Sequence, residues 1–339
     1  MTERQWISLH VFRHDDLSEL LIRQIGPLAT ALRAQGKVHG FFYLRYWEGG
    51  PHVRVRLLVE PDRTDEVRNE ATRALEEQLR AQPSRLSVDP VAYGAMARRI
   101  AEFEGHHAYD PRLRPVDTVH AIAYPPEHES FGYGPSLAAV ERHFDASARV
   151  ALDVLGLPAQ KQRTVALAMS LAALLCADRA MTAAPGPAGL RQPVPDTEDR
   201  SQLLDHVLSP TVDRSGPGLT RFDRNDAELT YRRARSELEA TALGIRKALG
   251  GGATVPPANA TPLATWLGSI TELSGTLHRL HQEGRFLPRN EQPARHPVAH
   301  ALLRCLHLHM NRLGVAMAEE ARLRHICALT LNGIDQGVL

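Results

Sequence analysis

The fold is decided by residues 42–57, FYLRYWEGGPHVRVRL, in which two β-rich runs flank a Gly-Gly-Pro turn. β-branched and aromatic residues favour strands, and the turn at residues 48–51 separates the two runs. In the second run, His52, Arg54 and Arg56 alternate with apolar residues, so they share one face of the predicted strand. The stretch therefore predicts a β-hairpin with one face for the core and one basic face.

Strands and helices alternate on both sides of this hairpin. Residues 6–13 have strand composition, with apolar and polar faces in alternation, and residues 15–34 follow a helical pattern. After the hairpin, residues 62–81 are predicted as a charged helix and residues 118–127 as a late strand. The order strand–helix–strand–strand–helix–strand predicts a ferredoxin-like α+β part over residues 1–135.

The rest of the chain, residues 136–339, follows helical patterns separated by loops rich in Pro and Gly. Helices are expected over Leu137–Leu155, Lys161–Met181, Ser201–Leu208, Asp226–Leu249, Pro262–Glu283, Ala294–Arg312 and from Val315 to about Leu331. The predicted fold is thus α+β: a ferredoxin-like mixed sheet with helices, followed by a mainly α-helical half. We expect the two halves to form one compact structural unit and to share one cleft.

Composition argues against several classes of protein. The formal net charge is +1, which weighs against a broad nucleic-acid or membrane surface. The polar N-terminus lacks the apolar core of a signal peptide. The most apolar run, TVALAMSLAALLCADRA at residues 164–180, is short and ends in charges, so we interpret it as a buried helix.

Cysteine usage and motif content limit the cofactor chemistry. Cys176, Cys305 and Cys327 are sparse and far apart, which fits a reduced, cytoplasmic protein with small buried thiols. The sequence has no CxxC, HExxH, Walker or GxGxxG pattern. We therefore expect no metal site and no cofactor.

The basic face of the hairpin allows two interpretations. The three residues of the second strand, together with Arg45 on the first, can form a solvated surface or salt bridges to the acidic helix at residues 62–81. They can also form an anion or oxyanion site, because guanidinium groups bind carboxylates and polarise carbonyl oxygens. The strand alone does not decide between these alternatives.

A second polar stripe lies on the helix predicted at residues 294–312. His300, Arg304, His307 and Asn311 follow a helical spacing beside an apolar stripe. A lone histidine at such a border is most often structural, but four polar groups in one stripe fit a cleft wall. This pattern makes His307 the strongest candidate for a general acid/base, and it is a poor metal site because it lacks Cys, Asp and Glu.

Three segments together resemble the C-terminal domain of lantibiotic dehydratases and its stand-alone relatives in thiopeptide biosynthesis. The segments are FFYLRYWEGGPHVRVRL at residues 41–57, YPPEHESFGYGPSLAAVERHFDASARVAL at residues 124–152 and HLHMNRLG at residues 307–314. They occur in the same order along most of the chain, and the first is the most specific.

The resemblance implies a chemistry and a set of residues. In the dehydratases this domain eliminates glutamate from glutamylated Ser or Thr of a ribosomal peptide. Its working groups are strand arginines, a glutamate and an arginine in an E-x-x-R-Y-G-G segment, and a histidine four residues before an Asn-Arg pair. Arg54 and Arg56 match the strand arginines, Glu127 matches the glutamate, and His307 matches the histidine.

One position departs from the elimination pattern. The motif's arginine falls on Ser130, and RYGG has become SFGY. Elimination needs cations for the departing carboxylate, so the loss weakens that assignment. The resemblance then favours the thiopeptide pyridine synthases, which join two dehydroalanines in a formal aza-[4+2] cycloaddition. Loss of water and of the leader peptide leaves a pyridine-centred macrocycle.

On this reading His307, Arg54 and Arg56 are the predicted catalytic residues. The predicted substrate-binding residues are Arg45, His52, Tyr124, Glu127, Ser130, Tyr133, Arg304, Asn311 and Arg312. The expected partner is a dehydrated, azole-containing precursor peptide with its leader, which an exposed sheet edge or basic residues such as Arg13 and Arg23 could hold. Two alternatives stay open: a glutamate-elimination subunit of a split dehydratase, and a non-catalytic scaffold that binds the leader.

Overall fold

The computed structural model describes residues 4–104, 109–182, 223–250, 260–288 and 296–336. The chain divides into two compact units. Unit 1 comprises Met1–Pro125, Ala151–Gly156 and Asn311–Gly314; unit 2 comprises Pro126–Val150, Leu157–Met310 and Val315–Leu339. The division of the sequence into residues 1–135 and 136–339, and the shared cleft, stay predictions.

Unit 1 contains a four-stranded antiparallel sheet. Its strands are β1 (Gln5–Phe12), β2 (Gly40–Tyr46), β3 (His52–Val59) and β4 (Thr118–Ala121), and their order is β2-β3-β1-β4. Each helical connection therefore joins two strands that have a third strand between them. This arrangement confirms the ferredoxin-like α+β prediction, although β4 is shorter than the strand expected over residues 118–127.

The first predicted helix is interrupted. It consists of α1 (Leu17–Leu20), the π-helical segment η1 (Leu21–Ile25) and α2 (Gly26–Ala34). Asp16 caps the start, because its carboxylate accepts a hydrogen bond from the Ser18 N–H at 2.8 Å. Pro27 has no N–H to donate, and the wider π turn ends two residues before it, at Ile25.

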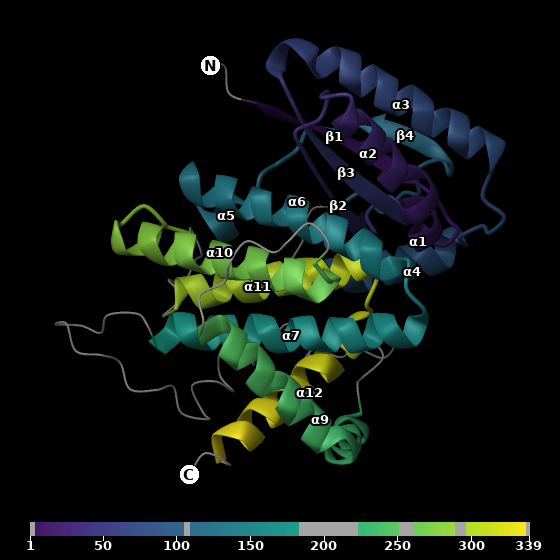
Figure 1. Cartoon of the computed structure of the whole chain (residues 1–339). Helices are drawn as coiled ribbons and strands as arrows, with labels where there is room; N and C mark the ends of the chain where they lie inside the picture. The colour runs from purple at the N-terminus through teal and green to yellow at the C-terminus, as the bar shows by residue number, and fades with distance from the viewer. Residues whose placement is uncertain (1–3, 105–108, 183–222, 251–259, 289–295, 337–339) are drawn as a thin grey trace. The chain divides into compact units, whose positions relative to one another are not determined.

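The apolar face of the sheet carries the core of unit 1. Helix α3 (Thr64–Ala81) follows the short 3₁₀ turn η2 (Pro61–Arg63) and lies against β1 and β4 (Figure 1). It is buried along the stripe of every fourth residue that the sequence predicts, namely Val67, Ala71, Leu75 and Leu79. The opposite face of the sheet is the one that carries the basic residues of β3.

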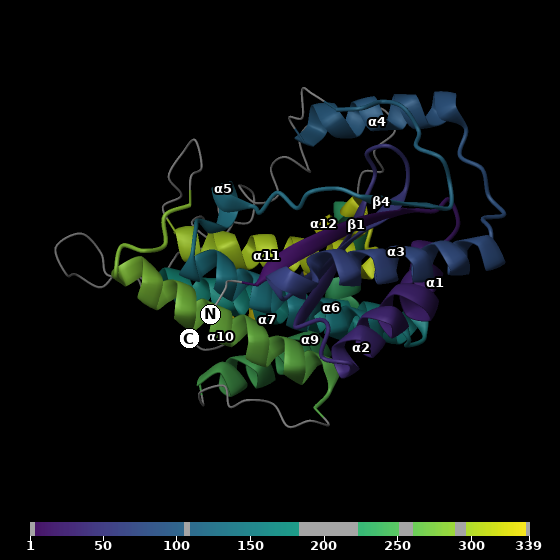
Figure 2. The same ribbon diagram turned by 90° about the horizontal axis from the view of Figure 1, so that it is seen from above.

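One helix of unit 1 was not predicted from the sequence. Helix α4 (Pro90–Glu104) stands apart from α3, with the strands between them (Figure 2). Its Tyr93 hydroxyl donates to the Trp47 carbonyl at 3.2 Å and accepts from the Gly50 N–H at 3.1 Å. These bonds attach α4 to the hairpin turn.

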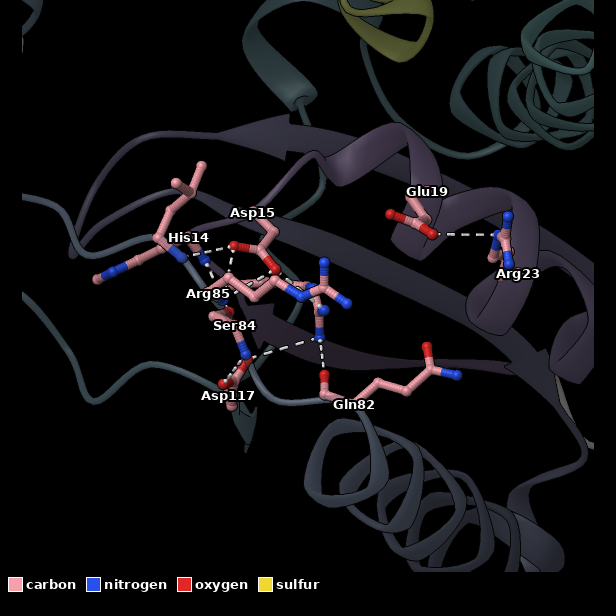
Figure 3. A network of polar contacts seen from close by, with 10 residues as sticks. His14, Asp15, Glu19, Arg23, Gln82, Ser84, Arg85 and Asp117 are labelled. Carbon is pink, nitrogen blue, oxygen red and sulfur yellow. Dashed lines mark hydrogen bonds and ion pairs between the residues drawn. The ribbon is translucent and has the colours of Figure 1, made fainter.

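A polar network closes the end of β1 (Figure 3). The Asp15 carboxylate accepts hydrogen bonds from the backbone N–H groups of Arg85 and Leu86. Arg13 donates to the Gln82 carbonyl at 2.8 Å and lies 3.6 Å from Asp117. Since Arg13 is only 8 % exposed, it belongs to this network and does not form part of an open surface for a leader peptide.

Unit 2 is helical, as predicted. Its elements are α5 (His128–Phe131), α6 (Pro135–Leu155), α7 (Ala159–Thr182), α9 (Arg224–Gly250), α10 (Pro262–Gln282), α11 (Pro297–Leu313) and α12 (Met317–Gln336). The last turns of α6 and α11 are counted in unit 1. The helix predicted over Ser201–Leu208 lies outside the described residues.

Helix α7 forms the core of unit 2, where it packs against α9, α10 and α12. By length and hydropathy alone it is the one helix of the described residues that reaches the size of a membrane span. However, 72 % of that window is buried inside the protein, as in the core helix of a globular unit. Cys176, Cys305 and Cys327 are buried and are not joined in disulfides, as the sequence predicts.

Candidate functional site

The basic face of the sheet in unit 1 is built by strand register. Three cross-strand pairs of β1 and β3 lie on this face: Ser8–Arg56, His10–Arg54 and Phe12–His52. The alternation of side chains sends Val53, Val55 and Leu57 to the core on the other face, where they are at most 3 % exposed. The sequence prediction of one apolar and one basic face is thus confirmed.

Arg56 is a buried cation. It is 4 % exposed, donates to the Ser8 hydroxyl, and places its guanidinium carbon 5.2 Å from the centre of the Tyr124 ring. Burial, followed by repulsion from Arg54, lowers the pKa of Arg56 to about 10, so the side chain stays charged at neutral pH. Within the described ranges Arg56 makes no ion pair, and a partly or fully negative oxygen would be a favourable neighbour for it.

Arg54 lies closer to solvent on the same face. Its guanidinium carbon stacks 3.3 Å above the centre of the Tyr46 ring, and its Nη2 lies 3.6 Å from Glu48 Oε2. The aromatic ring fixes the plane of the guanidinium, while the weak ion pair leaves it partly solvated. Arg54 is therefore held in place and remains accessible.

The histidines of this face are neutral. His52 donates from Nδ1 to the Gly50 carbonyl at 2.9 Å and stacks between Phe12 and His10, at centroid distances of 4.3 and 5.0 Å. Burial is the main cause that lowers the pKa of His52 to about 3 and that of His10 to about 2, and the neighbouring arginines add to it. The positive charge of the face therefore comes from its arginines.

The predicted binding residues Arg45, Asn311 and Arg312 contact one another. Asn311 accepts from the Arg45 N–H at 2.9 Å and donates to the Arg45 carbonyl at 3.0 Å, as a neighbouring strand would. Arg312 donates from Nε to the Tyr43 carbonyl at 3.1 Å. The end of α11 thus closes the β2 edge of the sheet, and a role of these three side chains in substrate binding stays a prediction.

In unit 2, His307 is held by a buried carboxylate. His307 Nδ1 lies 2.9 Å from Glu320 Oε2, and Glu320 also forms an ion pair with Arg324. Glu320 and Arg324 are 6 % and 4 % exposed, whereas the His307 side chain is 34 % exposed. The carboxylate orients the imidazole and leaves Nε2 as the ring nitrogen for a reacting group, which suits a general acid/base.

Charge neighbours also set the ionisation of Glu320. Burial alone would raise the pKa of this carboxyl, but His307 and Arg324 together outweigh burial and hold the pKa below its ordinary value. Glu320 is therefore a carboxylate at neutral pH. It acts on any reaction through His307, as a positioning residue.

Residues of the middle segment also lie in unit 2. Glu127 forms an ion pair with Arg304, at 3.1 Å, so the helix α11 supplies its cation. Ser130 is half-buried in α5, and Tyr133 is exposed and stacks on His128 with ring centres 4.1 Å apart. Arg304 and His307, three residues apart, lie on one face of α11.

Two groups of predicted residues emerge, one in each unit. Unit 1 holds Arg45, His52, Arg54, Arg56, Tyr124, Asn311 and Arg312, and unit 2 holds Glu127, Ser130, Tyr133, Arg304 and His307. The single cavity that would join the arginines of β3 to His307 stays a prediction.

Sequence reasoning missed His10, Glu320 and Arg324. The register that pairs His10 with Arg54 requires knowledge of which strands are neighbours. Glu320 and Arg324 are spaced by one helical turn and follow His307 on the next helix, a pattern that charged surface helices share. Among the described residues no group of three or more His, Cys, Asp or Glu could hold a metal ion.

Comparisons with known proteins place the chain in a family. A family model described as the C-terminal part of the lantibiotic biosynthesis dehydratase matches residues 6–331. A search of curated proteins finds no match.

Solved structures share the fold at low sequence identity. The pyridine synthase TbtD, from thiomuracin biosynthesis, is 20 % identical with a TM-score of 0.70, over 99 % of this chain and 100 % of that chain. TsrL is 16 % identical with a TM-score of 0.61, over 98 % and 96 %. The tRNA-dependent lantibiotic dehydratase MibB from Microbispora sp. 107891 is 17 % identical with a TM-score of 0.52, over 98 % of this chain but 28 % of that one. Because the family match spans nearly the whole described fold, this protein belongs to the lantibiotic biosynthesis dehydratase C-terminal family.

Proposed function

We propose that this protein is a pyridine synthase of thiopeptide biosynthesis, which closes a macrocycle between two dehydroalanines of a modified precursor peptide. The observation that carries the proposal is Ser130, which stands where the elimination motif of the family has an arginine. The elimination reaction needs that cation for its departing carboxylate, whereas a cycloaddition between two dehydroalanines releases water and an amide but no carboxylate.

The proposed reaction needs no redox step. The amide that precedes one dehydroalanine tautomerises to an aza-diene, and the second dehydroalanine adds to it with formation of two bonds. Water then leaves with the former amide oxygen. Expulsion of the leader peptide as an amide gives the aromatic pyridine, so every atom and electron pair is accounted for.

The geometry supplies groups for these steps. His307 would move the protons, with Glu320 fixing which ring nitrogen is available. Arg54 and Arg56 would polarise the amide oxygen, because buried or stacked guanidinium groups stabilise developing negative charge without reorganisation. Much of the rate would come from holding the two dehydroalanines together, since closing a large ring is entropically costly.

The partner of this reaction is the precursor peptide with its leader, dehydrated and carrying azoles. The β2 edge of the sheet is closed by Asn311 and Arg312, so an extended leader segment would have to pair elsewhere in the protein. Cytoplasmic location, where the peptide and its modifying enzymes are made, belongs to the same proposal.

The direct experiment is a reaction of the purified protein with a thiazole-containing peptide that carries two dehydroalanines and its leader. Mass spectrometry is expected to show a smaller macrocycle and a released leader amide. His307→Ala, with Glu320 intact, is expected to lower the rate at least about a hundredfold. Recovery of the unchanged peptide from the wild-type reaction would contradict the proposal.

Glutamate elimination is the second candidate, because Arg54, Arg56 and His307 match the elimination residues of the family. The substrate that the protein converts distinguishes the two candidate functions. A peptide with glutamylated serine would release glutamate if this second function were correct, and would remain intact with a pyridine synthase.

A further inference from the structure

The ring of Phe12, at the end of β1, is surrounded by basic side chains within unit 1. His52 stacks on it at 4.3 Å, His120 meets its edge at 5.5 Å, and the Arg114 guanidinium carbon lies 5.9 Å from the ring centre. Phe12 is 2 % exposed. A third arginine therefore reaches the face of the sheet that carries Arg54 and Arg56.

The hairpin turn holds Arg114 in this place. The Arg114 N–H donates to the Gly49 carbonyl at 2.8 Å. Gly49 has a φ of +77°, and a Cβ added there would lie 3.3 Å from Arg114 Cγ and 3.4 Å from its Cδ. The glycine thus provides both the left-handed turn and the space along which the arginine side chain lies.

Three arginines lie close enough to the two buried histidines of this group to affect their ionisation. Arg54, Arg56 and Arg114 all act on His10 and His52, where they add to burial in lowering the pKa of each imidazole. Burial, followed by Arg114, also lowers the pKa of His120.

The acidic neighbours are already engaged. Glu48 lies beside Arg54, Asp110 is bound by the exposed Arg112, and the Asp117 carboxylate accepts from the Ser84 hydroxyl at 2.7 Å. Arg114 itself forms no ion pair within the described part of the chain.

The group also has unused hydrogen-bonding capacity. His10 and His52 are 6 % and 1 % exposed, and the Nε2 atom of each ring is buried without a hydrogen-bond partner among the described residues. Buried polar atoms are normally satisfied, so two such atoms beside three arginines indicate a place for a bound polar group.

We propose that Arg114 is the third cation of a binding site shared with Arg54 and Arg56, and that this site takes a negatively polarised oxygen of the peptide. The inference rests on the proposed function for the identity of that oxygen, the amide oxygen that leaves as water. Arg114 lies in the loop before β4, far in sequence from the strand arginines. It is outside the three segments that resemble the family.

The test compares Arg114→Gln with Arg112→Gln. Arg112 is a matched control, because it lies two residues away and its side chain is 85 % exposed in an ion pair with Asp110.

Inorganic sulfate serves as the probe, and the ring proton signals of His10, His52 and His120 report its binding by NMR. We expect sulfate to bind about tenfold more weakly to the Arg114→Gln protein, which is the effect of one charge-assisted hydrogen bond. Equal binding by wild type and Arg114→Gln would overturn the inference.

Kinetics link the site to the reaction. With the peptide that carries two dehydroalanines, Arg114→Gln is expected to lower kcat/KM about tenfold, and Arg112→Gln to stay within about twofold. If the wild type fails to convert the peptide, the proposed function falls, but the sulfate comparison still decides on Arg114. If turnover is normal and Arg114→Gln matches the wild type in both measurements, only the inference about Arg114 falls.

Discussion

At the scale of single residues, the protein buries the charged side chain of Arg56 at a cost in folding stability. Arg56 is 4 % exposed and makes no ion pair within the described residues, and burial lowers its pKa to about 10. Desolvation of a lone cation is unfavourable, and its hydrogen bond to Ser8 compensates only in part. A buried cation that is retained despite this destabilisation is expected to serve binding or catalysis.

We predict that the double change Arg56→Met with Ser8→Ala raises the free energy of unfolding by about 1 kcal/mol and abolishes activity. Both partners are then replaced by apolar groups, so neither the charge nor the hydroxyl is left buried without a partner. Urea unfolding measures the effect. Ser8→Ala alone is the control, expected to destabilise by about 1 kcal/mol because Arg56 loses one of its two acceptors and keeps only the Val55 carbonyl at 3.3 Å. A large loss of stability in the double variant would contradict this account of Arg56.

The ionisation of Glu320 gives a second prediction at this scale. Its folded-state pKa lies below the ordinary 4.5, so its ionised form contributes stability above that pH, and the contribution is lost as the pH falls through the lower folded-state pKa. Glu320→Gln also leaves Arg324 as an uncompensated buried charge, so we expect it to destabilise by about 3 kcal/mol at pH 7.

This difference from the wild type should shrink in acid, once Glu320 is protonated in both folded and unfolded states. Unfolding by urea at a series of pH values tests it. Glu319→Gln is the matched control, because Glu319 is its exposed neighbour and lies 3.5 Å from Arg322. A destabilisation that does not vary with pH would contradict the assigned ionisation.

At the scale of elements, the end of α11 completes the sheet of unit 1. Asn311 pairs with the backbone of Arg45, and Gly314 ends the helix with a φ of +73°. A Cβ at Gly314 would lie 2.9 Å from the guanidinium carbon of Arg45. The glycine is therefore needed both for its conformation and for the room it leaves above the β2 edge.

We predict that Gly314→Ala destabilises the protein by about 2 kcal/mol, since it adds a clash with Arg45 to the cost of a left-handed alanine. Gly284 offers a matched control, because it follows α10 with a φ of +67° and has open space around it. Gly284→Ala should cost about 1 kcal/mol, the conformational part alone. Thermal unfolding measures the loss of stability in each variant. Equal losses would show that the contact with Arg45 does not contribute to the effect of Gly314→Ala.

The same elements show what the sequence can predict. Period-two alternation identified both faces of β3, and period-four spacing identified the buried stripe of α3, because burial of one face imposes these periods. Leu303, Leu306 and Met310 of α11 are at most 1 % exposed, as their stripe predicts.

Such patterns do not predict contacts between residues that are distant in sequence. The bonds of Asn311 to β2 and of Glu320 to His307 depend on which elements fold together, and α4 has no clear apolar period. Arg54, Arg56 and His307 were singled out by their spacing, whereas Glu127, Ser130 and the proposal that these groups serve one reaction came from the family resemblance.

At the scale of the whole molecule, the proposed reaction needs two groups of residues, one in each unit, to act on one peptide. Arg56 belongs to unit 1 and His307 to unit 2. We predict that Arg56→Ala and His307→Ala are strongly non-additive: the double variant should lose about as much kcat/KM as the worse single variant. Residues that act as one unit behave in this way. Losses that multiply would indicate that the two groups act independently of one another.

The most direct test of the central claim is a single reaction that offers the protein both candidate substrates, the peptide with two dehydroalanines and the peptide with glutamylated serine. Liquid chromatography with mass spectrometry follows both at once. The account predicts a pyridine macrocycle and leader amide from the first peptide, with the second left intact. Release of glutamate from the second peptide, with the first recovered unchanged, would contradict it.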